Sequence, residues 1–435
     1  MQRGHAPESG KECDGGITPM QLIGLAGIAL ILLVAWSLSE NRRAFPVRIV
    51  LWGFALQFLF AFAVLKVPGI VDGFQWLGDA VTRFLGFAQQ GAQFVFGRLV
   101  DPAYRETFGF IFAFTILPTI IFFSAVMAVL YHLGIMQKIV YAMGWLMQKT
   151  LRTSNIESLA AAANVFFGQT EAVLTVRPYL SVATRSELFA MMVGGFVTIA
   201  GGVLAGYIQM GIPATDLIAA SIISAPAGLM IAKILVPATG QELDRETAIP
   251  ENIYAQSQNV LEAAVNGTTE GVRLAVNIAA MLIVFLAFIA LADALFHFLY
   301  VHAAMPLGWN GFPKSLQEFF GILLSPIAYI VGVPSQDVEI FGGLIGTKIA
   351  LNEFVAYAQL SEYIQAGTLS ERTIHLATFA LCGFANFGSI AIQIGGIGGL
   401  VPERKAELAQ IGVKAMFGGV LANLLTAAVV SLLLP

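Results

Sequence analysis

The chain has 435 residues, of which 57% are apolar and only 11% are charged, against roughly 25% charged residues in a typical soluble domain. A mean hydropathy of +0.79 excludes an ordinary soluble enzyme and indicates an all-α polytopic membrane protein in contact with a lipid bilayer. The net charge of −4 says little about partners, but no basic patch indicates nucleic acid, and the two cysteines lie in contexts too different to suggest a disulfide framework, a metal site or a cofactor.

Eight apolar runs are long enough, at ~1.5 Å per residue, to cross a hydrocarbon core of ~30 Å as helices. They cover residues 19–38, 48–66, 108–132, 188–208, 215–235, 274–298, 373–400 and 411–434. Two further segments, 74–98 and 136–150, carry apolar residues at helical spacing with polar residues between them, which predicts helices lying at the membrane interface. The alternative for each is a tilted span interrupted by polar packing.

The positions of lysine and arginine predict the orientation of the spans. With the N-terminus outside, a majority of the 23 basic residues faces the cytoplasm: Arg42, Arg43, Arg48, Lys138, Lys149, Arg152, Arg177, Arg185, Lys233, Arg245, Arg273, Arg404, Lys405 and Lys414. We therefore expect both termini to be external, in a multi-pass protein of the cytoplasmic (inner) membrane. The polar stretch 241–271 is then a cytoplasmic linker, and its end, 255–269, is predicted to be a surface helix.

Two segments are too polar at their centres to face lipid as ordinary spans. The first, 155–180, and the second, 319–360, are the predicted re-entrant hairpins, and the second is expected to be broken at Pro326, Gly332, Pro334 and the pair Gly342-Gly343. Each hairpin is followed by two spans, and the two units begin on opposite sides of the membrane. Inverted repeats of this kind are typical of secondary transporters, in which non-helical backbone lines a cavity.

The first hairpin carries Gln169, Thr170 and Glu171 in an apolar stretch. A carboxylate at membrane depth costs about 2.5–3.5 kcal/mol, which favours a functional reason for its presence. An amide, a hydroxyl and a carboxylate together can read the planar amide edge of a nucleobase. The alternative is that they only hydrogen-bond helices together.

The second hairpin carries Glu353 beside Asn352. A carboxylate that accepts hydrogen bonds from vicinal hydroxyls is a common way to hold a sugar. The alternative is an ion pair with Lys348, five residues earlier, although that spacing puts the two residues on different helix faces.

Residues 380–400 contain a third polar cluster. Asn386 and Ser389 are three residues apart and share a helix face, and Phe384 could stack against a flat ring. The glycines from Gly388 onward would let a helix unwind. The alternative is an ordinary packed helix with small-residue contacts. In the corresponding span of the first repeat, Thr198 is a weaker candidate.

Three motifs resemble those of the concentrative nucleoside transporter family: Gly-Gln-Thr-Glu at 168–171, Gly-Thr-Lys-Ile-Ala-Leu-Asn-Glu-Phe-Val-Ala-Tyr at 346–357 and Phe-Ala-Asn-Phe-Gly-Ser at 384–389. The resemblance covers roughly residues 40–435. It implies nucleobase contacts from Gln169, Thr170, Glu171, Val203 and Phe384. It implies ribose contacts from Glu353, Asn386 and Ser389.

The resemblance also implies a co-transported sodium ion, held by Asn164, Phe167, Thr198 and Ile199. Some bacterial members use protons, so proton coupling is the alternative. The pair Gly168-Gln169 resembles members that accept purine and pyrimidine nucleosides alike, and the family forms homotrimers.

Pattern and resemblance together divide the chain into four parts. Residues 1–153 are expected to form the first part of a scaffold domain, with three spans and the interfacial helices. Residues 154–240 form the first repeat of a transport domain, 241–318 a cytoplasmic linker and a scaffold span, and 319–435 the second repeat.

The sequence therefore predicts a cation-coupled nucleoside symporter that works by alternating access. An intramembrane enzyme with Glu171 and Glu353 as a carboxylate pair is disfavoured, because no cluster of histidine, aspartate or cysteine supplies a nucleophile or a metal. A channel is disfavoured because inverted hairpins around a specific polar pocket suit alternating occlusion better than an open pore.

Overall fold

The computed structural model describes residues 19–109, 111–238, 257–309 and 311–434, and within these ranges every regular element is a helix. Seven helical segments in this part of the chain are long and apolar enough to cross a membrane, in agreement with seven of the eight predicted spans. The eighth, 373–400, is two shorter helices, α15 (Glu371–Leu381) and α16 (Phe387–Leu400), with a non-helical break between them. The fourth, 188–208, is also interrupted, between a helix that ends at Val197 and one that begins at Gly201. The chain is thus an all-helical membrane protein.

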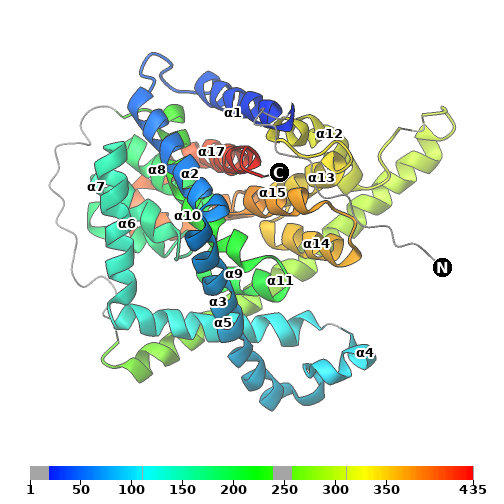
Figure 1. Ribbon diagram of the computed structural model, residues 1–435, viewed down its shortest axis with the longest axis horizontal. Coiled ribbons are helices and arrows are strands. Elements are labelled where there is room, and N and C mark those ends of the chain that lie inside the picture. The colour runs from blue at the N-terminus through cyan, green and yellow to red at the C-terminus, as the bar shows by residue number, and fades with distance from the viewer. Residues whose placement is uncertain (1–18, 110, 239–256, 310, 435) are drawn as a thin grey trace, which may run out of the picture.

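The helices differ sharply in how much of their surface is buried. The outer spans are α1 (Pro19–Ser37), α2 (Val47–Lys66), α5 (Phe112–His132) and α11 (Val260–Leu299). Only 11–28% of their apolar windows is buried, against 78–89% for the spans of the two repeats. Figure 1 shows α17 and α15 at the centre, with α1 above them and α5 below them. Helices that are apolar all round and exposed need lipid or another protein surface to cover them.

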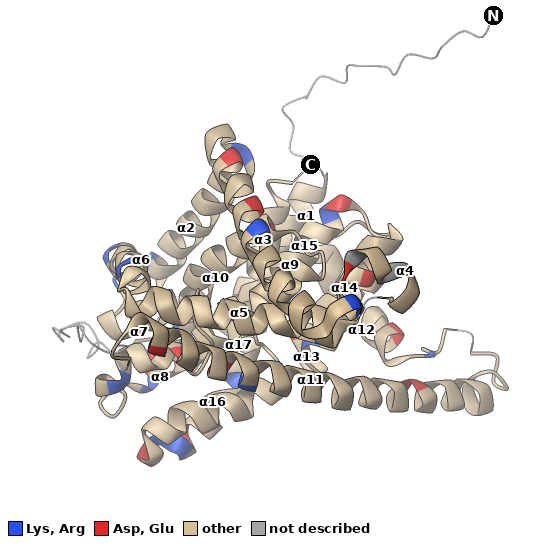
Figure 2. Cartoon of the chain, turned by 90° about the horizontal axis from the view of Figure 1, so that it is seen from below, with Lys and Arg blue, Asp and Glu red and all other residues tan. Residues whose placement is uncertain are grey.

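Small residues let two of the outer helices approach closely. Helices α5 and α11 run side by side in Figure 2. A methyl group at Gly271 would come within 2.8 Å of the Cα of Ile121, and one at Gly267 within 2.8 Å of the Cα of Ala125. Glycine at these positions therefore brings the two backbones together, as is common in membrane helix pairs.

The elements of the first repeat are α7 (Asn155–Asn164), the 3₁₀ helix η3 (Ala172–Tyr179), α8 (Arg185–Val197), α9 (Gly201–Gln209) and α10 (Ala214–Leu235). Those of the second repeat are α12 (Leu316–Val331), α13 (Val338–Ala350), α14 (Glu353–Ala366), α15, α16 and α17 (Lys405–Ser431). Apart from α12, which has no counterpart in the first set, both predicted repeats have a short helix, a turn and a second short helix, followed by a broken helix and then a long one. The order of elements therefore recurs.

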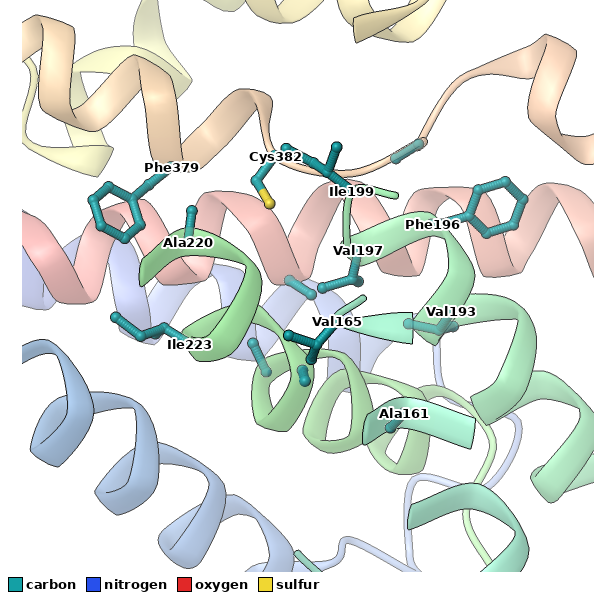
Figure 3. Packing of buried hydrophobic residues seen from close by; sticks show 14 of the residues in the cluster. Ala161, Val165, Val193, Phe196, Val197, Ile199, Ala220, Ile223, Phe379 and Cys382 are labelled. Carbon is teal, nitrogen blue, oxygen red and sulfur yellow. The ribbon is translucent and has the colours of Figure 1, made fainter. Parts of the chain in front are cut away.

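The two helix breaks touch each other at the centre of the molecule. Gly383 lies in the second break with a φ of +89°, and a side chain there would overlap the backbone of Phe196 and Val197 at the end of α8. Figure 3 shows Cys382 beside Ile199, with Val197 below them. Only glycine combines this backbone conformation with so close an approach.

The two predicted interfacial segments are helices, α3 (Pro68–Phe96) and α6 (Ile135–Leu151). Helix α3 begins six residues earlier than the prediction, because Pro68 suits the first turn of a helix, where its missing N–H costs nothing. The shorter elements are η1 (Gly97–Leu99), η2 (Pro102–Tyr104), α4 (Arg105–Phe108), the π-helix η4 (Tyr300–Ala304) and η5 (Pro402–Arg404).

Three predictions of local structure were wrong. Pro326 does not break the second segment, because α12 continues through it to Val331. The pair Gly342-Gly343 does not break a helix, because α13 runs through it. The two glycines lie against α12, where a methyl group would come within 2.9 Å of the backbone at Gly342 and within 3.1 Å at Gly343. The described part of 255–269 is not a separate surface helix, because α11 continues from Val260 without interruption. Residues 241–256 of the predicted linker, 241–271, lie outside the described residues.

Candidate functional site

The first turn of α14 places a buried carboxylate at the positive end of a helix. Asn352 caps α14, since its Oδ1 accepts a hydrogen bond from the backbone N–H of Val355 at 2.9 Å, and Glu353 follows as the first helical residue. The dipole of a helix stabilises negative charge at this end. One oxygen of Glu353 accepts from Tyr207 Oη at 3.3 Å and the other from Asn386 Nδ2 at 2.9 Å. Glu353 is thereby held by α9 of the first repeat and by the second break.

The start of α16 is built in the same way. Asn386 caps α16 with its Oδ1, which accepts from the backbone N–H of Ser389 at 2.8 Å, while its Nδ2 donates to Glu353. Ser389 and Gln393 follow at helical spacing on the same face, and all three side chains are buried. One face of α16 is therefore polar in an otherwise apolar helix.

The same face of α16 reaches the first hairpin. Gln393 Nε2 donates to Gln169 Oε1 at 3.1 Å and to the carbonyl of Met192 at 3.1 Å. One turn further, a side chain at Gly396 would overlap Thr170, so the loop of the first hairpin packs directly on this helix. The separation of seven positions between Asn386 and Gln393 corresponds to about 10 Å along a helix. Polar groups of both hairpins thus meet along a length that suits a small hydrophilic solute.

Three of the candidate residues lie apart from these hydrogen bonds. Glu171 is exposed, and its Oε2 accepts from the backbone N–H of Gly168 at 3.0 Å, within its own loop. Val203 is buried in the first turn of α9, after the first break. Phe384 lies, half-buried, in the second break. Both apolar residues therefore flank the breaks.

A buried oxygen at the end of α7 lacks a donor. Asn164 is fully buried, and its Nδ2 donates to the carbonyl of Ala160 at 3.0 Å. Its Oδ1 accepts no hydrogen bond from the described residues. Since a buried oxygen without a partner is costly, this atom is a candidate cation ligand.

The carbonyl end of α8 lies next to Asn164. A methyl group at Gly194 would be 3.1 Å from Asn164 Nδ2, and Thr198 Oγ1 donates to the carbonyl of the same Gly194 at 3.1 Å. Thr198 and Ile199 are buried in the first break. Oxygen atoms at the negative end of a helix suit a small hard cation.

The first hairpin is fixed to this break by its backbone. The carbonyl of Phe166 accepts from the N–H of Gly201 at 3.1 Å, and the next residue, Phe167, stacks its ring on Tyr131 with centroids 4.1 Å apart. Phe167 therefore lies next to the break, and its ring packs against Tyr131.

The alternative of an ion pair between Glu353 and Lys348 does not describe this structure. Lys348 Nζ donates instead to the carbonyls of Ala380 and Cys382, at 3.0 and 2.8 Å. Sequence reasoning gave no role to Gln393 or Tyr207. Gln393 could have been found from its spacing to Asn386 and Ser389, whereas no sequence signal places Tyr207 beside Glu353.

The chain matches known proteins over nearly its whole length. Residues 26–99 match the family part described as "Na+ dependent nucleoside transporter N-terminus", residues 113–214 the part described as "Nucleoside recognition", and residues 216–431 the part described as "Na+ dependent nucleoside transporter C-terminus". An uncharacterized transporter of Haemophilus influenzae is 45% identical over 416 residues, which are 94% of this chain and 97% of that protein.

Two further relatives carry a functional description. Sodium/nucleoside cotransporter 1 of Rattus norvegicus is 41% identical over 97% of this chain, which spans 65% of that protein's length. The structure of CNTnw in an inward-facing substrate-bound state is 41% identical, has a TM-score of 0.87 and covers 95% of this chain and 98% of its own.

Proposed function

This chain belongs to the family of Na⁺-dependent nucleoside transporters, and we propose that it imports nucleosides across the cytoplasmic membrane together with a sodium ion. Membership of this family makes it a transporter and not an enzyme. The observation that carries the proposal is the polar face of α16, which contacts Glu353 of the second hairpin at one end and Gln169 of the first at the other.

The proposed ribose site is the Glu353 end of this face. A carboxylate makes strong hydrogen bonds to vicinal hydroxyls, and Asn386 and Ser389 add an amide and a hydroxyl beside it. Glu353 already has two donors in Tyr207 and Asn386, so a ribose would join or replace hydrogen bonds of known geometry.

The proposed nucleobase site is the Gln169 end. The amide of Gln169 is oriented by Gln393, and Thr170 packs beside it on α16. An amide can match the donors and acceptors of purine and pyrimidine edges alike, which supports a broad nucleoside range. Val203 and Phe384 would supply apolar surface for the ring, and Glu171 would join only by turning away from Gly168.

The proposed sodium site lies where α7 meets the first break. Asn164 Oδ1 and Thr198 Oγ1 would supply side-chain oxygens, and Phe167 and Ile199 main-chain carbonyls. The unpartnered Oδ1 of Asn164 and the carbonyl end of α8 support this assignment. A proton would not need four oxygen ligands, so this assignment favours sodium coupling over proton coupling.

Sodium and nucleoside would stabilise the same arrangement of the first hairpin. Any increase in nucleoside affinity caused by sodium must equal the increase in sodium affinity caused by nucleoside. One sodium ion also contributes about 2.3 kcal/mol per 100 mV of membrane potential to uptake. Uphill import by alternating access then follows from the coupled binding of both.

The difference in burial between the outer and the central spans supports a scaffold around a mobile transport domain. The outer spans in 1–153 and 241–318 would form the scaffold, and the central helices of 154–240 and 319–435 the transport domain. The exposed apolar faces of the outer spans suit a homotrimer embedded in lipid, with both termini external as the basic residues predict.

Uptake of labelled uridine into proteoliposomes tests the proposal. An inward sodium gradient should drive accumulation, and replacement of sodium by choline at the same pH should abolish it. Uptake that survives this replacement and follows the pH gradient would indicate proton coupling and overturn the sodium site. An ohmic current without any ion gradient would indicate a channel.

A further inference from the structure

Lys348 carries a positive charge into the centre of the protein, and no carboxylate of the described residues forms an ion pair with it. Its side chain is 1% exposed, and its Nζ donates to the carbonyls of Ala380 and Cys382 at 3.0 and 2.8 Å. These carbonyls end α15, where the helix dipole is negative. A buried ammonium is costly, so its place at a helix end needs a reason beyond packing.

The order of elements places Lys348 opposite the proposed sodium site. Helix α13 of the second repeat corresponds to α7 of the first, and the broken helix α15–α16 corresponds to α8–α9. Lys348 lies near the end of α13, as Asn164 lies at the end of α7. Each faces the carbonyl end of the helix that precedes the break in its own repeat.

The C-terminal ends of α8 and α15 differ in which groups compensate their partial negative charge. In the second repeat the ammonium of Lys348 lies on the carbonyls. In the first repeat two carbonyls of the last turn of α8, those of Gly194 and Val197, accept only from Thr198 Oγ1 and from an amide, Asn423 Nδ2, among the described side chains. The first end thus has neutral donors and the unpartnered oxygen of Asn164, whereas the second has a cation of its own.

The two ends also lie together. Asn423 of α17 donates from the same Nδ2 to the carbonyls of Val197 and Cys382, and Gly383 packs on the backbone of Phe196 and Val197. Two negative helix ends in contact repel each other unless cations lie between or beside them. At the centre of the fold, the adjacent ends of α8 and α15 therefore form two sites that favour a positive charge.

We propose that the ammonium of Lys348 is a resident cation, which occupies in the second repeat the place that the transported sodium ion takes in the first. The inference rests on the proposed sodium symport. It follows that the second break cannot take a sodium ion, and that each nucleoside crosses with a single one. It also follows that replacement of Lys348 by a residue with a side-chain oxygen creates a second sodium site.

The coupling ratio tests this inference in proteoliposomes held at zero membrane potential. The measurement is the uridine gradient that a fixed sodium gradient can just maintain. A tenfold sodium gradient should maintain a uridine gradient of about tenfold in the wild type and of about a hundredfold in Lys348→Ser. With two coupled ions, the uridine ratio equals the square of the sodium ratio. Lys348→Arg retains a resident cation and should stay at about tenfold.

Lys348→Met is the control for packing, because its side chain is similarly long but has neither charge nor oxygen. It should take up uridine more slowly than the wild type, with the coupling ratio unchanged. A ratio that stays at the wild-type value in a transporting Lys348→Ser would overturn the inference. So would a wild type that already holds about a hundredfold gradient, a result that needs no variant to fold. Uptake by the wild type without sodium would instead remove the proposed function itself.

Discussion

Gln393 donates a hydrogen bond from its Nε2 to Oε1 of Gln169 across 3.1 Å, and so joins α16 of the second repeat to the loop of the first. On the same helix face, Asn386 donates to Glu353 at 2.9 Å. A displacement of either hairpin must therefore alter the contacts of α16. This gives a physical route by which a solute bound at one end is sensed at the other.

Substitution of Gln393 by leucine should weaken nucleoside binding through Gln169. The amide of Gln169 would lose the donor that orients it, and a hydrogen bond of this kind contributes about 1 kcal/mol. We expect the KM for uridine to rise by about fivefold to tenfold, measured from the concentration dependence of uptake. Gln410→Leu, on the exposed side of α17, is the matched control. An unchanged KM in Gln393→Leu would show that the orientation of Gln169 does not matter for binding.

Substitution of Glu353 by glutamine should remove the preference for ribose. Because hydrogen bonds to a charged acceptor contribute about 1.5–3 kcal/mol, uridine should bind at least about tenfold more weakly to Glu353→Gln. Binding of 2′-deoxyuridine should change much less. Isothermal titration with both nucleosides measures the difference, and Glu362→Gln, exposed on the same helix α14, serves as control. Equal losses for the two nucleosides would contradict a contact with the 2′-hydroxyl.

Substitution of Thr198 by valine should raise the sodium concentration needed for half-maximal uptake by about tenfold, since an oxygen ligand is lost at nearly constant volume. Thr378→Val is a close control: both threonines are buried near the end of the helix before a break, and both donate to the carbonyl four residues earlier. The sodium dependence of uptake in the two variants decides the point. Equal shifts in both would mean that the threonine acts through packing.

The helices themselves were largely predictable, because membrane spans follow from apolar length alone. Seven of the eight spans were found, five of them within four residues at each end, whereas 274–298 and 411–434 begin 14 and 9 residues after the observed helical segments. The eighth prediction missed the break at 382–386, since Cys382-Gly-Phe-Ala-Asn386 reads as apolar as a continuous helix. The opposite error occurred at Gly342-Gly343, where glycine serves the approach of α12 and not a break.

The candidate site was predictable only residue by residue. Gln169, Glu353 and Asn386 stand out because polar side chains are rare in apolar segments. Their partners could not be read from the sequence: Tyr207 reaches Glu353 from 146 positions away, and Lys348 meets carbonyls that carry no side-chain signal. Long-range contacts of this kind are decided by how the two breaks pack together.

The buried ion pair of Lys233 and Glu157 should be costly to break from one side. Their charged atoms are 2.6 Å apart, and both side chains are 1% exposed. Loss of one partner from a buried pair typically costs about 3–5 kcal/mol, because the other charge is left unpaired. Lys233→Met should therefore lower the melting temperature of the purified protein strongly. The double variant Lys233→Met/Glu157→Gln should recover most of the loss, and a double variant as unstable as the single one would contradict this reading.

A surface ion pair should make stability depend on pH in the acid range. Glu40 contacts Arg185 at 3.1 Å and Lys414 at 3.5 Å. Partial burial raises the pKa of Glu40, but the hydrogen bond from Arg185 and the charges of Lys414 and Arg185 hold it below the ordinary value of 4.5. Stability from these contacts is therefore present above that value and is lost as the pH falls through the lower pKa of the folded state.

The effect is expected to be small, about 1 kcal/mol or less, because the groups are partly exposed. Melting temperatures measured from neutral pH downward should fall less steeply for Glu40→Gln than for the wild type below the ordinary pKa of glutamate. Glu270→Gln removes the more exposed ion pair with Arg273 and should leave the fall of the melting temperature at acid pH the same as in the wild type. Identical acid limbs in Glu40→Gln and the wild type would show that Glu40 is not linked to folding.

The most direct test of the central claim is a structure of this protein with uridine and sodium bound. The base should contact Gln169, with the hydrogen bond from Gln393 retained, and the ribose hydroxyls should contact Glu353 and Asn386 on the same face of α16. Density for uridine away from that face, with Gln169 and Glu353 both out of its reach, would contradict a site shared by the two hairpins.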